Sequence, residues 1–210
     1  MVCGDVPIAD KSRTGKMPPI VRKPDAVKKL GTVPTERLVS LVSRLSEEAW
    51  AKEDVGKEND FAVFHHTRHL IFRFIAGNRN PENFYSNPAW DVWRSELEPV
   101  MHAAIRPYAF HKPVFAKAML ARLQAGHEID RHRDGAGSNL RCHKIHVPLV
   151  TNPGATFLVD ETHYHLERGY AWEVNNIKPH GARNLSGQDR IHFIFEVFDG
   201  VYSDTDATRV

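Results

Sequence analysis

The chain of 210 residues is 41% hydrophobic and 26% charged, and its formal net charge is only +2. This length can bury one core, while a small net charge spread along the chain gives no indication of a nucleic-acid partner. We find no apolar run near the roughly 18 residues of a membrane span and no secretory segment at the N-terminus. Two cysteines, Cys3 and Cys142, provide neither a disulfide framework nor a paired-cysteine metal site. We therefore expect a cytoplasmic protein without a membrane partner.

The N-terminal region combines several prolines with many basic residues. Such a composition breaks helices and offers little to bury, so residues 1–33 are predicted to form an irregular arm. Residues 34–210 are expected to form a single domain. Apolar residues at helical spacing predict two helices, over 35–52 and 89–105, and we expect them to back a sheet.

Short apolar or alternating runs predict strands through the rest of the chain. They cover residues 61–66, 69–75, 114–123, 144–150, 156–159, 170–174 and 191–198. Turn sequences such as Asn152-Pro153-Gly154 separate the later runs. Many short strands after a helical N-terminal half predict a mainly β fold with flanking helices, a sandwich or jelly roll.

The segment His132-Arg133-Asp134 carries the strongest metal-ligand pattern, with His180 on a later strand. His132 and Asp134 stand two apart in an extended segment, so their side chains lie on one side of the backbone. Pro179 favours an extended or turn conformation before His180, and Gly181 permits a close approach after it. Two imidazoles and one carboxylate form the ligand set of Fe(II) oxygenases, although Zn, Mn, Co and Ni accept the same ligands.

Other histidines offer rival ligand sets, because the chain contains 13 of them. His127 with Asp130, or His163 with His165, are the local alternatives. Glycines on both sides of the His-Arg-Asp segment leave room for a co-substrate, which favours that segment over its rivals.

Arg190 begins an apolar strand, where an inward-facing charge needs a partner. A carboxylate ligand held by two parallel hydrogen bonds would supply one. The alternatives are a solvent-facing position at a strand edge, or pairing with Asp189 or Glu196.

Several C-terminal segments together resemble the aspartyl/asparaginyl β-hydroxylase family of Fe(II)/2-oxoglutarate-dependent dioxygenases. They are Lys144–Pro153, Gly169–Asn176, His180 and Asp189–His192. The similarity extends loosely over residues 61–123. It implies a double-stranded β-helix, the cupin-like jelly roll, with Fe(II), 2-oxoglutarate and dioxygen as cofactor and co-substrates. It also implies hydroxylation of an Asp or Asn β carbon in a protein or peptide.

The resemblance assigns roles to individual positions. His132 and His180 match the two histidine ligands of the family, and Arg190 matches the residue that binds the distal carboxylate of 2-oxoglutarate. His146 matches a histidine that helps to hold the co-substrate. Lys144 stands where the family usually has an arginine, so it implies a second cationic contact, although a lysine cannot form the bidentate fork.

Asp134 departs from part of the family, because the animal members have no carboxylate at this position and many bacterial and phage relatives do. If Asp134 binds the metal, the triad is complete. If it does not, two histidines hold the metal and Asp134 stands beside them.

The sequence leaves the substrate open. A free amino acid or a natural-product intermediate is as reasonable physically as a protein side chain. Candidate residues for substrate recognition near the metal segment are Arg131, Arg133, Arg141 and His143, which could equally be solvated surface residues. Candidate residues for the pocket are residues 61–66, Tyr170 and Trp172, which could equally be core residues. Two other functions also compete: a metal hydrolase or isomerase with Zn-activated water, and a non-catalytic binding module.

Overall fold

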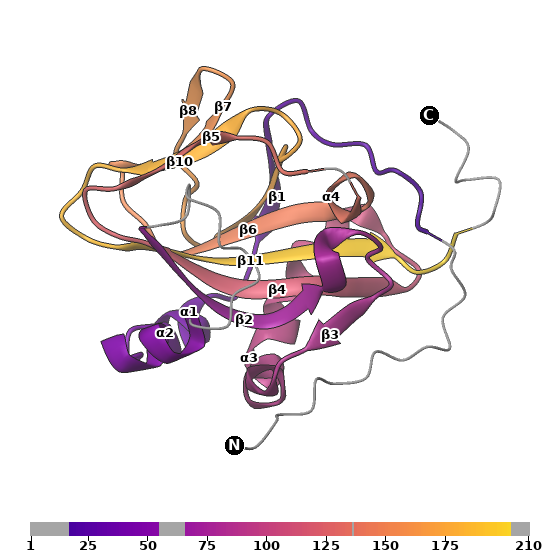
Figure 1. Cartoon of the computed structure of the whole chain (residues 1–210), viewed down its shortest axis with the longest axis horizontal. Coiled ribbons are helices and arrows are strands. Elements are labelled where there is room, and N and C mark those ends of the chain that lie inside the picture. Colours follow the sequence, from indigo (N-terminus) through magenta and orange to yellow (C-terminus); the bar gives the residue numbers. More distant parts are fainter. Residues whose placement is uncertain (1–16, 55–65, 136, 203–210) are drawn as a thin grey trace.

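Two antiparallel β-sheets form the framework of the computed structural model, which describes residues 17–54, 66–135 and 137–202 (Figure 1). The larger sheet has seven strands, in the spatial order β1 (Val27–Thr32), β9 (Tyr170–Val174), β6 (His143–Val150), β11 (Arg190–Asp199), β4 (Pro113–Leu123), β2 (Thr67–Ile75) and β3 (Phe84–Ser86). The smaller sheet has four, in the order β5 (Glu128–His132), β10 (His180–Asn184), β7 (Ala155–Val159) and β8 (Thr162–Tyr164). This architecture confirms the predicted mainly β, jelly-roll class.

Three helices lie on the face of the larger sheet that is turned away from the smaller sheet (Figure 1). They are α1 (Glu36–Val42), α2 (Glu47–Asp54) and α3 (Pro88–Ala104), and a single turn, α4 (Ser138–Arg141), precedes β6. The helix α3 begins with a proline in its first turn, where the missing N–H costs nothing. Its apolar stripe, which includes Leu97 and Met101, packs in the main core. None of the helices in the described part of the chain is long and apolar enough to cross a membrane.

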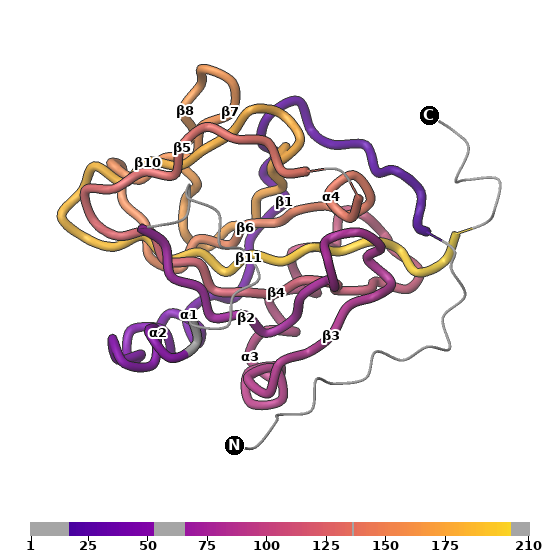
Figure 2. The backbone as a smooth tube through the Cα atoms, in the orientation of Figure 1, coloured from indigo at the N-terminus to yellow at the C-terminus, as the bar shows by residue number. Residues whose placement is uncertain are grey.

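The central strands of the larger sheet present different side chains to their two faces. On β6, Ile145 and Val147 join the helix-covered core, while Lys144 and His146 line a cavity on the opposite face. This is the period of two expected of a strand. In Figure 2 the tube passes through β2, β4, β11 and β6 as neighbours, so early and late segments of the chain jointly build this cavity face.

Two of the predicted elements differ from the structure. The predicted irregular arm is wrong for Val27–Thr32, which forms the edge strand β1 and pairs with β9. Most of the side chains of β1 are exposed, so its sequence lacks the apolar alternation that marks a strand. The single predicted helix over 35–52 is also wrong, because α1 ends at Val42 and α2 begins afresh at Glu47. The Ser46 hydroxyl accepts a hydrogen bond from the backbone N–H of Ala49, which favours a new helix start there.

Two expectations fall outside the described residues. The predicted strand at 61–66 and its suggested place in the pocket concern mostly residues 61–65, which lie outside the described residues. Cys3 also lies outside them. Cys142 is described and is a buried free cysteine.

At Gly181 the strand β10 approaches its antiparallel neighbour β5 very closely. A Cβ atom at this residue would lie 2.6 Å from the backbone oxygen of Ile129, closer than real Cβ contacts allow. The register of the two strands also shifts between His180 and Ala182. A side chain at Gly181 would therefore push the two strands apart.

We expect Gly181→Ala to lower the free energy of unfolding by about 1–3 kcal/mol, because the added methyl group would clash with the backbone of β5. Urea denaturation monitored by fluorescence would measure the change. Gly187→Ala is the matched control, since nothing lies within 4 Å of a Cβ at Gly187, and it should leave stability nearly unchanged. Equal stability of the two variants would contradict the proposed steric role of Gly181.

Candidate active site

A cavity of about 580 Å³ lies between the two sheets. Side chains of β4, β6 and β11 line one side, and side chains of β5, β7 and β10 line the other. The three residues predicted as metal ligands, and also Lys144, His146 and Arg190, all line this space. The structure therefore brings together every predicted site residue from strands that are far apart in the sequence.

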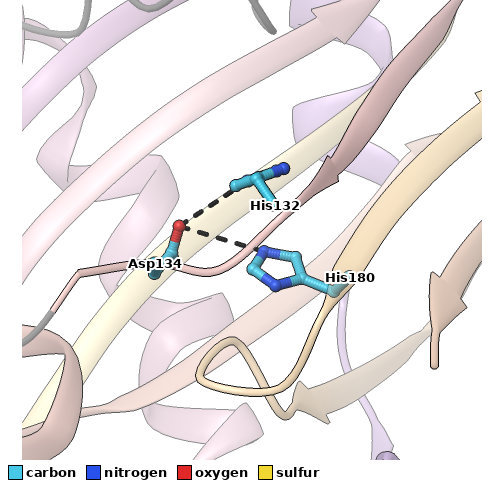
Figure 3. Close-up of side chains that lie close together, drawn as sticks. All are labelled: His132, Asp134 and His180. Atoms are coloured by element: carbon cyan, nitrogen blue, oxygen red, sulfur yellow. Dashed lines mark ion pairs between the residues drawn. The ribbon is translucent and has the colours of Figure 1, made fainter.

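His132 and His180 lie side by side on two adjacent strands of the smaller sheet. They are direct partners in the antiparallel pairing of β5 with β10, and their ring centroids are 4.4 Å apart. Oδ1 of Asp134 lies 3.7 Å from Nε2 of His132 and 3.9 Å from Nε2 of His180 (Figure 3). One ligand atom from each of the three residues lies within 4.8 Å of the others. This is a spacing that one metal ion could bridge.

Backbone carbonyls fix the orientation of both imidazole rings. Nδ1 of His132 lies 2.7 Å from the carbonyl oxygen of Asp130, and Nδ1 of His180 lies 3.0 Å from that of Lys178. A ring that donates from Nδ1 leaves Nε2 free to act as a ligand. Burial also lowers the pKa of His180 to about 4, so this ring is neutral near pH 7, as a metal ligand must be.

The two oxygens of Asp134 have separate environments. Oδ1 faces the two histidines, while Oδ2 accepts hydrogen bonds from Lys144 Nζ at 2.6 Å and from Asn176 Nδ2 at 2.9 Å. Burial alone would raise the pKa of this carboxyl, but the Lys144 ammonium, His180 and the two hydrogen bonds hold it well below its ordinary value. The carboxylate is therefore ionised and held in place before any metal binds.

Arg190 lies at another part of the cavity wall and is only 3% exposed. No carboxylate pairs with it among the described residues, so the predicted alternatives of Asp189 and Glu196 do not apply: those two residues pair with Arg122 and Lys117. Nε and Nη2 of Arg190 lie 3.0 Å and 2.8 Å from the two ring nitrogens of His192. Since a neutral imidazole accepts at only one nitrogen, the guanidinium retains free donors.

Burial lowers the pKa of Arg190 to about 9, which still leaves the guanidinium charged at neutral pH. Nδ1 of His146 lies 3.3 Å from Nδ1 of His192. Nε2 of His146 has no hydrogen-bond partner among the described residues. Burial, followed by the charge of Arg190, lowers the pKa of both histidines, so both are neutral. Arg190, which has no carboxylate partner among the described residues, thus shares His192 as a neighbour with His146, whose Nε2 is open.

The rival ligand sets do not assemble. His127 stacks on the ring of His66, His163 contacts Thr156, and His165 contacts the carbonyl of Ala155. Among the described residues, His132, Asp134 and His180 are the single group of three metal-type side chains with mutually close ligand atoms.

Most of the suggested substrate-recognition residues point elsewhere. Arg131 pairs with Glu161, Arg141 donates to the carbonyl of Pro18, and His143 lies against Glu173. Tyr170 and Trp172 lie near the ammonium of Lys29 and do not line the cavity. Arg133 alone of these candidates lines the cavity, and it is exposed.

Sequence reasoning missed several residues that support the site. Asn176 donates to Asp134 and also to Oδ1 of Asn139. Lys144, expected to contact the co-substrate, pairs with Asp134 instead. A buried pair formed by Lys117 and Glu196 was not predicted, because the two residues are 79 positions apart in sequence. Only the polar residues within otherwise apolar strands signalled it.

Residues 91–199 match the sequence model of the family described as aspartyl/asparaginyl beta-hydroxylase. The match spans more than half of the chain and includes every residue of the candidate site. The chain belongs to this family. The expected enzyme class, a Fe(II)/2-oxoglutarate-dependent dioxygenase that acts as a hydroxylase, is thereby confirmed together with its cofactor and co-substrates. The hydrolase and binding-module alternatives are set aside.

Solved structures share the fold at low sequence identity. An oxidoreductase of the 2OG-Fe(II) oxygenase family from Burkholderia pseudomallei has a TM-score of 0.57 at 14% identity, covering 88% of this chain and 96% of its own. HygX from Streptomyces hygroscopicus, solved with nickel, 2-oxoglutarate and hygromycin B, has a TM-score of 0.50 at 14% identity and 85% coverage of both chains. No curated protein sequence matches the chain.

The residues present fit the groups that this family uses. Two imidazoles and one carboxylate with converging ligand atoms are the donor set expected for Fe(II). Arg190, which has no carboxylate partner among the described residues, and the open Nε2 of His146 are suited to a carboxylate-bearing co-substrate.

We expect Lys144→Met to weaken metal binding by about 10- to 100-fold if Asp134 is a ligand, because the variant loses the strongest group that orients this carboxylate. Calorimetric titration with Mn(II) would measure the affinity. Lys178→Met is the matched control: Lys178 pairs with Asp160 at the surface, where its side chain is 44% exposed. Unchanged affinity in Lys144→Met would argue that Asp134 does not bind the metal.

Proposed function

We propose that His132, Asp134 and His180 hold the Fe(II), and that Arg190 and His146 hold 2-oxoglutarate. On this proposal the enzyme hydroxylates the β carbon of an Asp- or Asn-type residue in a protein or peptide. The observation that carries the proposal is the buried, charged Arg190 without a carboxylate partner among the described residues, in the same cavity as the His-Asp-His group.

A dicarboxylate co-substrate explains that observation. Leaving a guanidinium buried and unpaired is costly, and a carboxylate ligand would remove the cost through a charge-assisted, bidentate contact. The unpaired Nε2 of His146 offers a further neutral hydrogen-bonding group in the same region. Lys144 then serves the metal side of the site by holding Asp134.

The protein's part in the reaction is binding, orientation and exclusion of water. When bound, the Fe(II) centre supplies the activation of dioxygen, coupled to oxidative decarboxylation of 2-oxoglutarate to succinate and carbon dioxide. Arg190 fixes the far end of the co-substrate, and the carbonyls of Asp130 and Lys178 keep both imidazoles oriented. Apolar cavity residues such as Ile194, Met119 and Phe157 keep bulk water from the reacting C–H group.

We expect Arg190→Met to weaken anaerobic 2-oxoglutarate binding by at least about thirtyfold, because it removes one partner of a buried charge pair. The visible charge-transfer absorption of the protein with Fe(II) and 2-oxoglutarate measures binding without turnover. Arg183→Met, on the exposed side of β10 where Arg183 pairs with Glu128, is the control.

The free Arg190→Met protein should unfold no more easily than the wild type, since the substitution removes an unpaired buried charge. Unchanged 2-oxoglutarate affinity in a folded Arg190→Met protein with confirmed iron occupancy would refute the assignment of Arg190.

Turnover separates the two possible ligand sets. We expect His132→Ala and His180→Ala to abolish substrate-dependent succinate formation, because each removes an imidazole ligand. Asp134→Ala should also abolish it if the triad is complete, and should leave measurable activity if two histidines suffice. The assay uses a panel of Asp- and Asn-containing peptides, with free amino acids as a second arm. Full activity in His180→Ala would overturn the metal site.

A further inference from the structure

Three charged side chains form a row across the central strands on the cavity face. Glu196 of β11 is the direct cross-strand partner of Lys117 on β4 and of Lys144 on β6, and all three line the cavity. Direct partners have Cβ atoms about 5 Å apart. Since Lys144 contacts Asp134, the row begins at the candidate metal site. Arg190 lies six residues before Glu196 on the same strand, about 20 Å away.

Lys117 and Glu196 form a buried pair with unused hydrogen-bonding capacity. Their side chains are 7% and 3% exposed, and Lys117 Nζ lies 3.2 Å from Glu196 Oε1. The other oxygen, Oε2, is buried and has no hydrogen-bond partner among the described residues. The Lys117 ammonium otherwise lies 5.0 Å from the ring centroid of Phe74. Buried polar atoms are nearly always paired, so an open acceptor beside open donors indicates a place for a ligand.

The surrounding charge selects the kind of ligand. Glu196 interacts electrostatically with Lys23 and Lys144 as well as with Lys117, while Lys23 also interacts with Glu173 and Lys144 with Asp134. The three ammonium groups are therefore balanced by three carboxylates, which leaves no net charge to attract a charged ligand. A cationic ligand at Glu196 would lie against the Lys117 ammonium. A carboxylate would face Glu196 and leave Oε2 unpaired. An uncharged group that carries both an N–H donor and a C=O acceptor satisfies both members of the pair.

We propose that Lys117 and Glu196 form a substrate subsite for an amide group, with the amide N–H donated to Glu196 Oε2 and the amide oxygen accepting from Lys117 Nζ. The amide is either a side-chain carboxamide or a backbone amide of the substrate. This inference rests on the proposed function only in taking the cavity as the place where substrate binds, because the subsite itself requires neither iron nor 2-oxoglutarate.

Methyl NMR of methionine-labelled full-length protein, with no iron added, tests the subsite directly. The chain has four methionines, and Met119 lines the cavity two residues from Lys117, while Met101 in the helix-covered core serves as an internal reference. The probes are butanamide, its N–H-free isostere 2-pentanone, butanoate and butylammonium. We expect butanamide to shift the Met119 signal saturably, with an affinity about tenfold higher than that of each other probe.

Two variants and a second amide sharpen the test. Glu196→Gln and Lys117→Met should each abolish the preference for butanamide over 2-pentanone. Glu173→Gln is the control, because Glu173 is also a buried glutamate but accepts a hydrogen bond from the Tyr108 hydroxyl and does not line the cavity. N-methylbutanamide distinguishes the sources of the amide: equal binding points to a backbone amide, and much weaker binding points to a primary carboxamide.

Equal or tighter binding of 2-pentanone, butanoate or butylammonium would overturn the amide subsite, as would the lack of any saturable Met119 shift. Retention of the preference in both folded variants would do the same. If one variant fails to fold, the probe series in the wild type still decides. Failure of 2-oxoglutarate to bind through Arg190 would refute the proposed function and leave the amide preference standing, so the two failures are distinguishable.

Discussion

The pairing of β5 with β10 is the constraint on which the site depends. It sets His132 directly opposite His180, and a slip of one residue would turn one imidazole to the other face of the sheet. The absence of a side chain at Gly181 lets the strands approach closely enough for this register. Asp134 is then tied by its backbone N–H to the carbonyl of Asn176, just before β10. The two imidazoles are thus placed by a sheet, which is more rigid than a loop, and Asp134 follows directly after the strand β5.

Charge compensation explains how a cavity with several buried charges can be stable. Asp134 is paired with Lys144, and Glu196 is paired with Lys117. Arg190 is the exception within the described residues, since its hydrogen-bond contacts are with the neutral His192 and no carboxylate pairs with it. A buried charge without a partner costs stability, so its retention favours a role in binding an anion that arrives with the ligand. The position without a partner is therefore more informative about function than the paired positions.

The sequence predicted the long central strands well because burial on both faces makes them nearly continuous apolar runs, as in β4 and β11. It missed β3 and β8, which have three residues each. It singled out His132 and Asp134 from their spacing of two residues, and His180 from the neighbouring Pro179 and Gly181. The structure brings the ligand atoms of these three residues within 4.8 Å of one another. The sequence assigned Lys144 to the co-substrate, since only the tertiary structure shows that Asp134 lies within 2.6 Å of this side chain. Partners distant in sequence leave no local signal.

The two oxygens of Asp134 differ in what they can bind, because their neighbours differ. Oδ2 accepts from both Lys144 and Asn176, so its lone pairs are engaged, whereas Oδ1 faces the two Nε2 atoms. A carboxylate held in this way can offer a metal one oxygen and cannot readily offer both. In the proposed site this oxygen and the two imidazole nitrogens would hold the metal and would leave room for co-substrate and dioxygen. In the proposed metal site, Lys144 would therefore keep Asp134 from offering the metal its second oxygen.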